Sequence, residues 1–379
     1  MHTMNTLSQH TRQRVSFIRL VLFGSLMLIS GMAAAQSSHV TVGGNVFGGG
    51  KMAPVGRGTT VLINQSGAVV TGDVYGGGAL AKVDTALVAV APQTPVTATS
   101  IDSTLVTVLQ GTVKGNVYGG GLGQAAVEDD PATLDVDETV VAVEADVYGG
   151  VHVYIGNSEG GSAILGNTVG LNVTGGNVFG CNNVNGSPKK DVKVDIWQTA
   201  HTDPNEVDHD NVFTTFTAFK NNVSHEKTAF AIQGVYGGGN EANYVPLATN
   251  TYSSSVFIHN CDNTVKMVYG GGRAADVGME VAEDNLIKAN VYVTVEGGRI
   301  DTLFGGGDGH TLTDPSAPWN ASTNPYRAAD IYGNAISAIN GGFFTAAFAG
   351  SNTAGDIIGG SKQLTVLKTG PCSDGVGVD

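Results

Sequence analysis

A short motif, an aromatic residue followed by three glycines, recurs along most of the chain and restricts the fold more than any other feature. Consecutive copies are separated by roughly 30 residues plus insertions, a period typical of solenoids, in which each coil contacts only its neighbours. The motif predicts a stack of similar coils. Full copies begin at Phe47, Tyr75, Tyr118, Tyr236, Tyr269 and Phe304, weaker copies begin at Tyr148 and Phe179, and a worn copy ends at Phe348-Ala349-Gly350.

Alternating, β-branched segments precede the motifs, for example residues 60–64, 105–109 and 291–295. Alternation with a period of two indicates strands with one buried face. The 55 glycines do not occur at every third residue, which excludes collagen. We therefore predict an all-β parallel β-helix (β-solenoid) of about nine irregular coils, right-handed because parallel crossovers nearly always are. A sandwich of antiparallel strands is the alternative.

Residues 1–35 have the pattern of a secretory signal peptide. Three arginines, at positions 12, 14 and 19, precede an apolar stretch at 20–29 and the small residues Ala33-Ala34-Ala35. We expect a mature chain from Gln36 that is secreted or displayed on the cell surface. No later segment resembles a transmembrane helix.

The solenoid domain is expected to cover residues 36–379, with a large insertion near 181–229. Residues 363–367 look like the first strand of another coil, and nothing after them resembles a cap. Because solenoids need polar caps, we expect either that the domain is truncated here or that this end docks on something else.

Charge and cysteine content exclude several partners. The formal net charge is −14, and it is three units more negative without the arginines of the signal peptide. An acidic surface repels phosphate, so we expect no nucleic-acid partner. The three cysteines, Cys181, Cys261 and Cys372, allow at most one disulfide and have no metal-ligand spacing.

Asparagine or aspartate stands two positions before the aromatic residue in five copies. Stacked coils would align these side chains into a ladder that hydrogen-bonds turn backbone in neighbouring coils. A line of ligand-binding carboxylates is the alternative, but Asn and Asp interchange and an amide cannot do acid–base chemistry. The five residues are Asn45, Asp73, Asn116, Asp146 and Asn177.

The aromatic residues of the motif form a second predicted column. If its tyrosines were exposed, they would stack on sugar rings and form a glycan-binding strip. The alternative is that the rings stack on one another and cover the glycines, which the free exchange of Phe for Tyr favours. The tyrosines of the candidate strip are Tyr75, Tyr118, Tyr148, Tyr236 and Tyr269.

One cluster of acidic residues in the large insertion is a candidate calcium site, because Ca²⁺ prefers oxygen ligands. Its spacing matches no established loop motif, so a solvated acidic loop is the favoured interpretation. The residues are Asp203, Glu206, Asp208 and Asp210.

The chain lacks a His-Glu-x-x-His helix and a phosphate-binding loop. The Val-Tyr-Gly-Gly-Gly repeats behind a signal peptide resemble the glycine-rich, adhesin-like β-solenoid proteins that bacteria secrete or display. The resemblance implies a surface protein that contacts glycans or proteins and has no cofactor. The regular repeats and the absence of a catalytic constellation favour a non-enzymatic protein that binds through its flank and loops. The alternative is a β-helix polysaccharide lyase or glycoside hydrolase, which requires carboxylates and a basic residue in one cleft.

Overall fold

The computed structural model describes residues 40–85, 103–127, 139–158, 162–165, 167–169, 172–174, 176–199, 230–261, 263–282, 285–311, 326–367 and 377–378. The expected signal peptide lies outside these residues. The described part is all-β and contains no helix. It therefore contains no helix long and apolar enough to cross a membrane.

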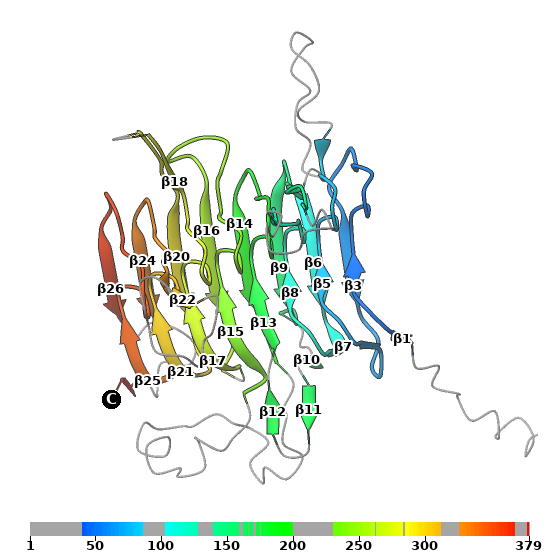
Figure 1. The fold of residues 1–379 in the computed structure, drawn as a ribbon. Helices are drawn as coiled ribbons and strands as arrows, with labels where there is room; N and C mark the ends of the chain where they lie inside the picture. Colours follow the sequence, from blue (N-terminus) through cyan, green and yellow to red (C-terminus); the bar gives the residue numbers. More distant parts are fainter. Residues whose placement is uncertain are drawn as a thin grey trace, which may run out of the picture. The chain divides into compact units, whose positions relative to one another are not determined.

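Two long parallel sheets carry most of the strands (Figure 1). The eight-stranded sheet contains, in spatial order, β26 (Lys362–Val366), β24 (Ala335–Ile339), β20 (Asn290–Val295), β16 (Ser253–Ile258), β14 (Val192–Ile196), β9 (Gly150–Ile155), β6 (Ser103–Val108) and β3 (Thr60–Ile63). The nine-stranded sheet contains β2 (Val46–Phe47), β5 (Val74–Tyr75), β8 (Val117–Tyr118), β13 (Gly176–Phe179), β15 (Ile232–Tyr236), β17 (Thr264–Tyr269), β21 (Arg299–Phe304), β25 (Phe343–Phe348) and β27 (Gly377–Val378).

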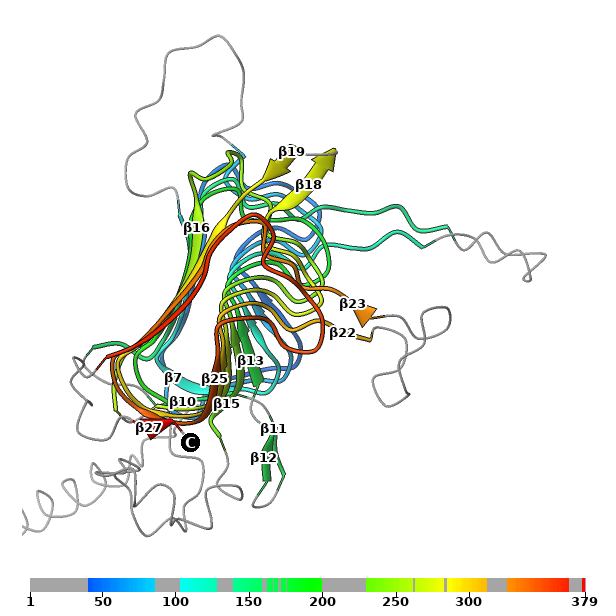
Figure 2. The ribbon, with the colours of Figure 1, turned by 90° about the vertical axis from the view of Figure 1, so that its left-hand side faces the viewer.

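Smaller elements complete the coils. A four-stranded parallel sheet consists of β1 (Thr41–Val42), β4 (Val69–Val70), β7 (Gln110–Val113) and β10 (Ser162–Leu165). Antiparallel hairpins are formed by β11 (Asn167–Val169) with β12 (Asn172–Thr174), β18 (Met279–Ala282) with β19 (Asn285–Ile287), and β22 (His310–Thr311) with β23 (Tyr326–Arg327). Figure 2 shows these hairpins projecting from the stacked coils.

A third side of the coils is joined by single parallel bridges rather than by strands. The bridges link Val55, Val83, Val147 and Pro188 in one series, and Tyr244, Val277, Ile331 and Ile357 in another. All pairs in the three larger sheets are parallel, which is consistent with a β-solenoid and excludes the antiparallel sandwich.

Register across the coils follows the sequence motif. The aromatic positions pair directly from strand to strand, as in Tyr75 with Tyr118 and Tyr236 with Tyr269. The worn copy also belongs to the series, because β21 pairs with β25 and brings Phe304 opposite Phe348. The strand expected at residues 363–367 is present as β26, which pairs with β24.

The core lies between the two long sheets and consists of aliphatic columns. Val106, Val153, Val194, Val256 and Val293 occupy the same inward position on consecutive strands, and each is fully buried or nearly so. Their neighbours two positions away are buried as well, so the period-two pattern produces one continuous core.

Two expectations about the repeat need correction. Tyr148 follows Val147, which lies on the third side, so this copy of the motif does not contribute to the nine-stranded sheet. The expected insertion at 181–229 starts too early, because β14 is an interior strand of the eight-stranded sheet and pairs with β9 and β16. Both errors have a local cause. Tyr148-Gly149-Gly150 resembles the repeated motif, and the polar residues of β14 resemble an insertion loop.

The cysteines are used differently. Cys261 is disulfide-bonded, whereas Cys181 is a free thiol in the core. Burial raises the pKa of the Cys181 thiol well above its usual value, so this residue acts as a small apolar side chain and not as a nucleophile.

Candidate functional site

The aromatic column is a buried ladder and not an exposed strip. Neighbouring ring centroids lie 4.6–5.1 Å apart, and the interplanar angles of these pairs are 4–12°. Each interior ring is therefore covered by the rings of the coils above and below it. The ladder consists of Phe47, Tyr75, Tyr118, Phe179, Tyr236, Tyr269, Phe304 and Phe348.

The prediction of an exposed sugar-binding strip is wrong for the tyrosines of this ladder. Tyr75, Tyr118, Tyr236 and Tyr269 are all buried, and three of their hydroxyl groups bond to neighbouring side chains. Asn183, for example, donates a hydrogen bond of 2.8 Å to the Tyr75 hydroxyl. Side chains from segments that follow the motifs lie beside the tyrosine hydroxyls, among them Asn183, Asp308 and Asn352.

Tyr148 lies apart from the ladder. Its ring is 5.8 Å from the Lys82 ammonium group, which also approaches its hydroxyl. Tyr148 therefore lies on the third side of the coils, apart from the other four tyrosines of the predicted strip.

Four of the five Asn and Asp residues form the predicted ladder. The side-chain oxygen of Asn45 accepts the Asp73 backbone N–H at 2.9 Å, Asp73 accepts that of Asn116 at 2.7 Å, and Asn116 accepts that of Asn177 at 2.9 Å. Each side chain thus binds turn backbone of the next coil, a structural role. Asp146 lies on the third side instead, where it accepts the Ser187 backbone N–H.

The candidate calcium ligands Asp203, Glu206, Asp208 and Asp210 lie outside the described residues. Within the part of the chain that the structure describes, no group of three or more His, Cys, Asp or Glu side chains could hold a metal ion.

The outer face of the eight-stranded sheet carries a group that the sequence did not reveal. We call His152, Asp195, His259 and Glu296 the Asp195 cluster. The Nε2 atoms of His152 and His259 both donate hydrogen bonds to the Asp195 carboxylate, the latter at 2.6 Å. Nδ1 of His259 faces a carboxylate oxygen of Glu296 at 3.5 Å.

These four side chains meet because their strands are neighbours. His152 is on β9 and Asp195 on β14, while His259 and Glu296 directly follow β16 and β20. All four occupy outward positions that alternate with core residues. The cluster becomes more accessible toward its edge, since the Asp195 side chain is 11% exposed and that of Glu296 is 38% exposed.

Aromatic rings surround the cluster. Trp197 stacks on His259 with centroids 3.7 Å apart and an interplanar angle of 6°. Phe257 lies 5.7 Å from the same imidazole, and Tyr154 packs against His152 at 3.9 Å. Trp197, Phe257 and Tyr154 are all partly exposed. The face thus combines flat apolar rings with hydrogen-bonding groups of both kinds.

The histidines keep Asp195 ionised. Burial by itself would raise the pKa of Asp195, but the hydrogen bonds and charges of His152 and His259 outweigh burial and lower the pKa to about 2. Asp195 therefore carries a negative charge at any physiological pH.

We expect Asp195→Asn to lower the free energy of unfolding by about 2 kcal/mol at neutral pH, because a pKa depression of one unit corresponds to about 1.4 kcal/mol. A depressed carboxylate pKa stabilises the fold fully above its ordinary value of 3.8 and loses that effect as the pH falls toward about 2. Urea unfolding of parent and variant over this range measures the difference, which should shrink with acidification.

The matched control is Asp301→Asn. Asp301 lies at a partly exposed position of β21, so this substitution should change the free energy of unfolding little at any pH. An Asp195→Asn effect that is the same at low and neutral pH would contradict the role of the two histidines.

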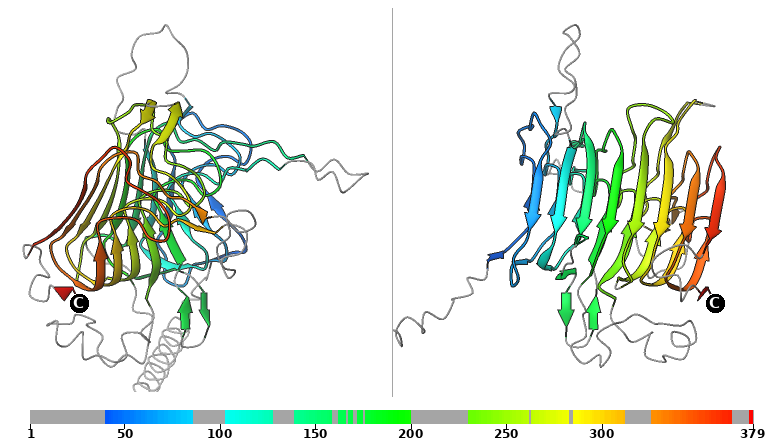
Figure 3. Two further views of the ribbon diagram at one scale, coloured as in Figure 1. Left: turned by 60° about the vertical axis from the view of Figure 1, so that its left-hand side comes forward. Right: turned by 180° about the vertical axis from the view of Figure 1, so that it is seen from behind.

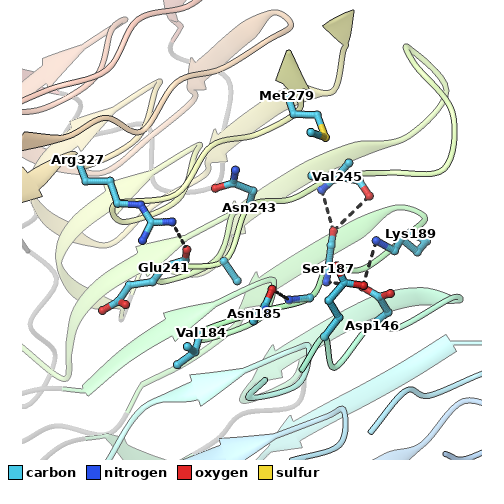
Figure 4. A pocket seen from close by; sticks show the side chains of 13 residues that line it. Asp146, Val184, Asn185, Ser187, Lys189, Glu241, Asn243, Val245, Met279 and Arg327 are labelled. Atoms are coloured by element: carbon cyan, nitrogen blue, oxygen red, sulfur yellow. Dashed lines mark hydrogen bonds and ion pairs between the residues drawn. The ribbon is translucent and has the colours of Figure 1, made fainter. Parts of the chain in front are cut away.

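A second polar region is a pocket of about 340 Å³ beside the third side (Figure 4). Glu144, Asp146, Lys189, Glu241 and Arg327 contribute its charged groups. Several of these already bind one another or the backbone: Lys189 pairs with Asp146 at 3.1 Å, and Arg327 donates to the Glu241 carbonyl at 2.6 Å. Much of this wall therefore holds neighbouring coils together.

Comparisons of the chain with protein-family models, with curated proteins and with solved structures found no match. The signal that could have revealed the Asp195 cluster is the series of outward positions on the strands, where residues 152, 154, 195, 197, 257 and 259 are aromatic or ionisable.

Proposed function

We propose that this chain is an exported, non-enzymatic, adhesin-like surface or extracellular protein that binds glycans on the outer face of its eight-stranded sheet. In this proposal the fold is a right-handed β-solenoid of about nine coils, which supports the binding face rigidly. The observation that carries the proposal is the position of Trp197 beside the Asp195 cluster.

Sugars need two kinds of contact, and this face offers both. An aromatic ring such as Trp197 packs against the C–H face of a pyranose, while charged groups bind its hydroxyls. Asp195 and Glu296 offer carboxylate oxygens that accept hydrogen bonds from hydroxyls, and the two histidines, whose Nε2 atoms bind Asp195, hold this carboxylate in place. Because the groups are held on neighbouring strands, little order has to be gained on binding.

Export is supported by two features that do not depend on the site. The N-terminal arginines, apolar stretch and small residues fit a cleaved signal. The disulfide at Cys261 fits an oxidising compartment, since structural disulfides are rare in the cytosol.

A glycan array probed with the purified protein tests the proposal. We expect binding to a restricted set of glycans, and a loss of affinity of about tenfold or more in Trp197→Ala, because that variant removes the largest ring at the site. The matched control is Leu62→Ala, an exposed apolar residue on the outer face of the same sheet, three strands from β14.

Binding should persist in Leu62→Ala, and both variants should retain the melting temperature of the parent within a few degrees. Array binding that is unaffected by Trp197→Ala would place the site elsewhere, and no binding to any glycan by the parent would exclude a glycan-binding role.

The alternative is a polysaccharide lyase or glycoside hydrolase, and the polar pocket is the observation that favours it. Three carboxylates, from Glu144, Asp146 and Glu241, line this pocket together with Lys189 and Arg327. Release of reducing or unsaturated sugar ends from polysaccharides, abolished by Glu241→Gln, would support the alternative. Binding without cleavage supports the proposal above.

A further inference from the structure

The two ends of the stack are complementary half-coils. The first strands, β1 and β2, belong to the four- and nine-stranded sheets, and no described strand of the eight-stranded sheet precedes β3. At the other end β26 closes the eight-stranded sheet, and of the described residues only the two of β27 follow it in the nine-stranded sheet. One end therefore has the second half of a coil, and the other has the first half.

The end that carries β26 exposes apolar side chains that its register would bury. Phe348 continues the aromatic ladder but is 49% exposed, compared with 9% for Phe304 beneath it. Val366 occupies an inward position of β26, in register with Ile339, yet the two are 50% and 0% exposed. No described ring covers the outer face of Phe348.

The end that carries β2 is apolar too. Val42, Val46 and Val55 pack against the core but remain only partly buried, as does Phe47, the first ring of the ladder. Figure 1 and the right-hand view of Figure 3 place β3 and β26 at opposite edges of their sheet. Within the described residues, no strand pairs with the outer edge of β3 or of β26.

We propose that two copies of this chain stack head to tail, so that β1 and β2 of one copy complete the coil that β26 of the other begins. In this arrangement Phe47 of the second copy stacks on Phe348, its β3 pairs with β26, and its Val55 bridges to Ile357. The two long sheets and the third side each continue without a gap.

Register supports this fit in detail. Val46-Phe47 has the same relation to β5 as Ala347-Phe348 has to β21, so β2 aligns with the uncovered second half of β25. β27 covers only Phe343 and Phe344, the first half of β25. In the stacked pair, β1 of the second copy takes the place that β27 holds in the single chain.

Charge both limits and tunes the contact. Lysine on an edge strand commonly opposes association, but Lys362 of β26 is paired with Asp356 of the same end at 2.9 Å. The acidic net charge makes copies repel one another, so added salt should strengthen the contact. Since the contact joins two different surfaces, it leaves free ends and forms open chains of molecules.

Sedimentation velocity over a wide protein concentration range tests the proposal. We expect the parent to form dimers and longer species that increase with concentration and salt. Phe348→Asp and Phe47→Asp should each weaken association about tenfold or more, because each places a charge in the stacked ladder. The control Leu247→Asp, an equally exposed apolar residue away from both ends, should behave as the parent.

Mixing the Phe348→Asp variant with the Phe47→Asp variant is the most decisive part of the experiment. Each variant retains one intact end, so an equimolar mixture should form a dimer that neither variant forms alone. Circular dichroism and melting curves confirm that both variants remain folded. A parent that is monomeric at all concentrations and salt levels, or a mixture that does not dimerise, would overturn the proposal.

Discussion

Gly77→Val is expected to destabilise the protein by about 3 kcal/mol or more, a large fraction of the roughly 5–15 kcal/mol that stabilises an ordinary protein. A Cβ atom on Gly77 would lie 2.7 Å from the backbone nitrogen of Gly121 and 2.8 Å from its Cα. Backbone atoms of the next coil cannot move aside without separating the coils, whose Gly77 N–H and Gly120 carbonyl are 3.0 Å apart. Thermal and urea unfolding measure the loss.

Gly350→Val is the matched control, because Gly350 has the same place in the motif but belongs to the end of the ladder. A Cβ there meets no atom within 4 Å. We expect nearly unchanged stability for this variant. Equal destabilisation at both glycines would mean that the triplets serve turn conformation and not the close approach of coils.

Tyr118→Ala should cost about 4 kcal/mol, as is usual for removal of a large buried aromatic side chain. Its ring is 2% exposed and lies between Tyr75 at 4.8 Å and Phe179 at 4.9 Å. Loss of the ring breaks the ladder in two and leaves a cavity that rigid neighbouring strands cannot fill. The free energy of unfolding in urea measures the effect.

Two controls separate the causes. Tyr118→Phe retains the ring and should be close to neutral, since Phe occupies the same position in other coils. Phe348→Ala, at the half-exposed end of the ladder, should cost only about 1 kcal/mol. A Tyr118→Ala variant as stable as Phe348→Ala would show that stacking between coils contributes little.

Local patterns were sufficient to predict the stack. The glycine triplets, the alternating strands and the Asn and Asp residues two positions before the aromatic ring each repeat with the coil, so their alignment follows from one register. Tyr148 misled because Tyr148-Gly149-Gly150 resembles the motif while the chain there already enters β9. Residue types alone cannot show whether a segment belongs to the third side or to the nine-stranded sheet, because the same residue types occur in both.

The residues of the Asp195 cluster carry a sequence signal, but their proximity could not be predicted, for a different reason. Its four members come from strands that are separated by insertions of unequal length, so only the observed pairing of β9, β14, β16 and β20 brings them together. The stacking of the aromatic rings followed from the exchange of Phe for Tyr, but the residues that cover them did not, because those side chains come from loops whose paths the repeat does not determine. The repeat period predicts which residues of neighbouring coils stack on one another. It does not predict which loop side chains cover the stacked residues.

The fluorescence of Trp197 during titration with a glycan is the sharpest test of a binding site on the outer face of the eight-stranded sheet. The chain has two tryptophans, so a Trp319→Phe variant leaves Trp197 as the only reporter. We predict a saturable change in its emission that follows binding and disappears in the additional variant Asp195→Asn. A glycan that binds the protein while the emission of Trp197 stays constant would contradict a binding site on this face.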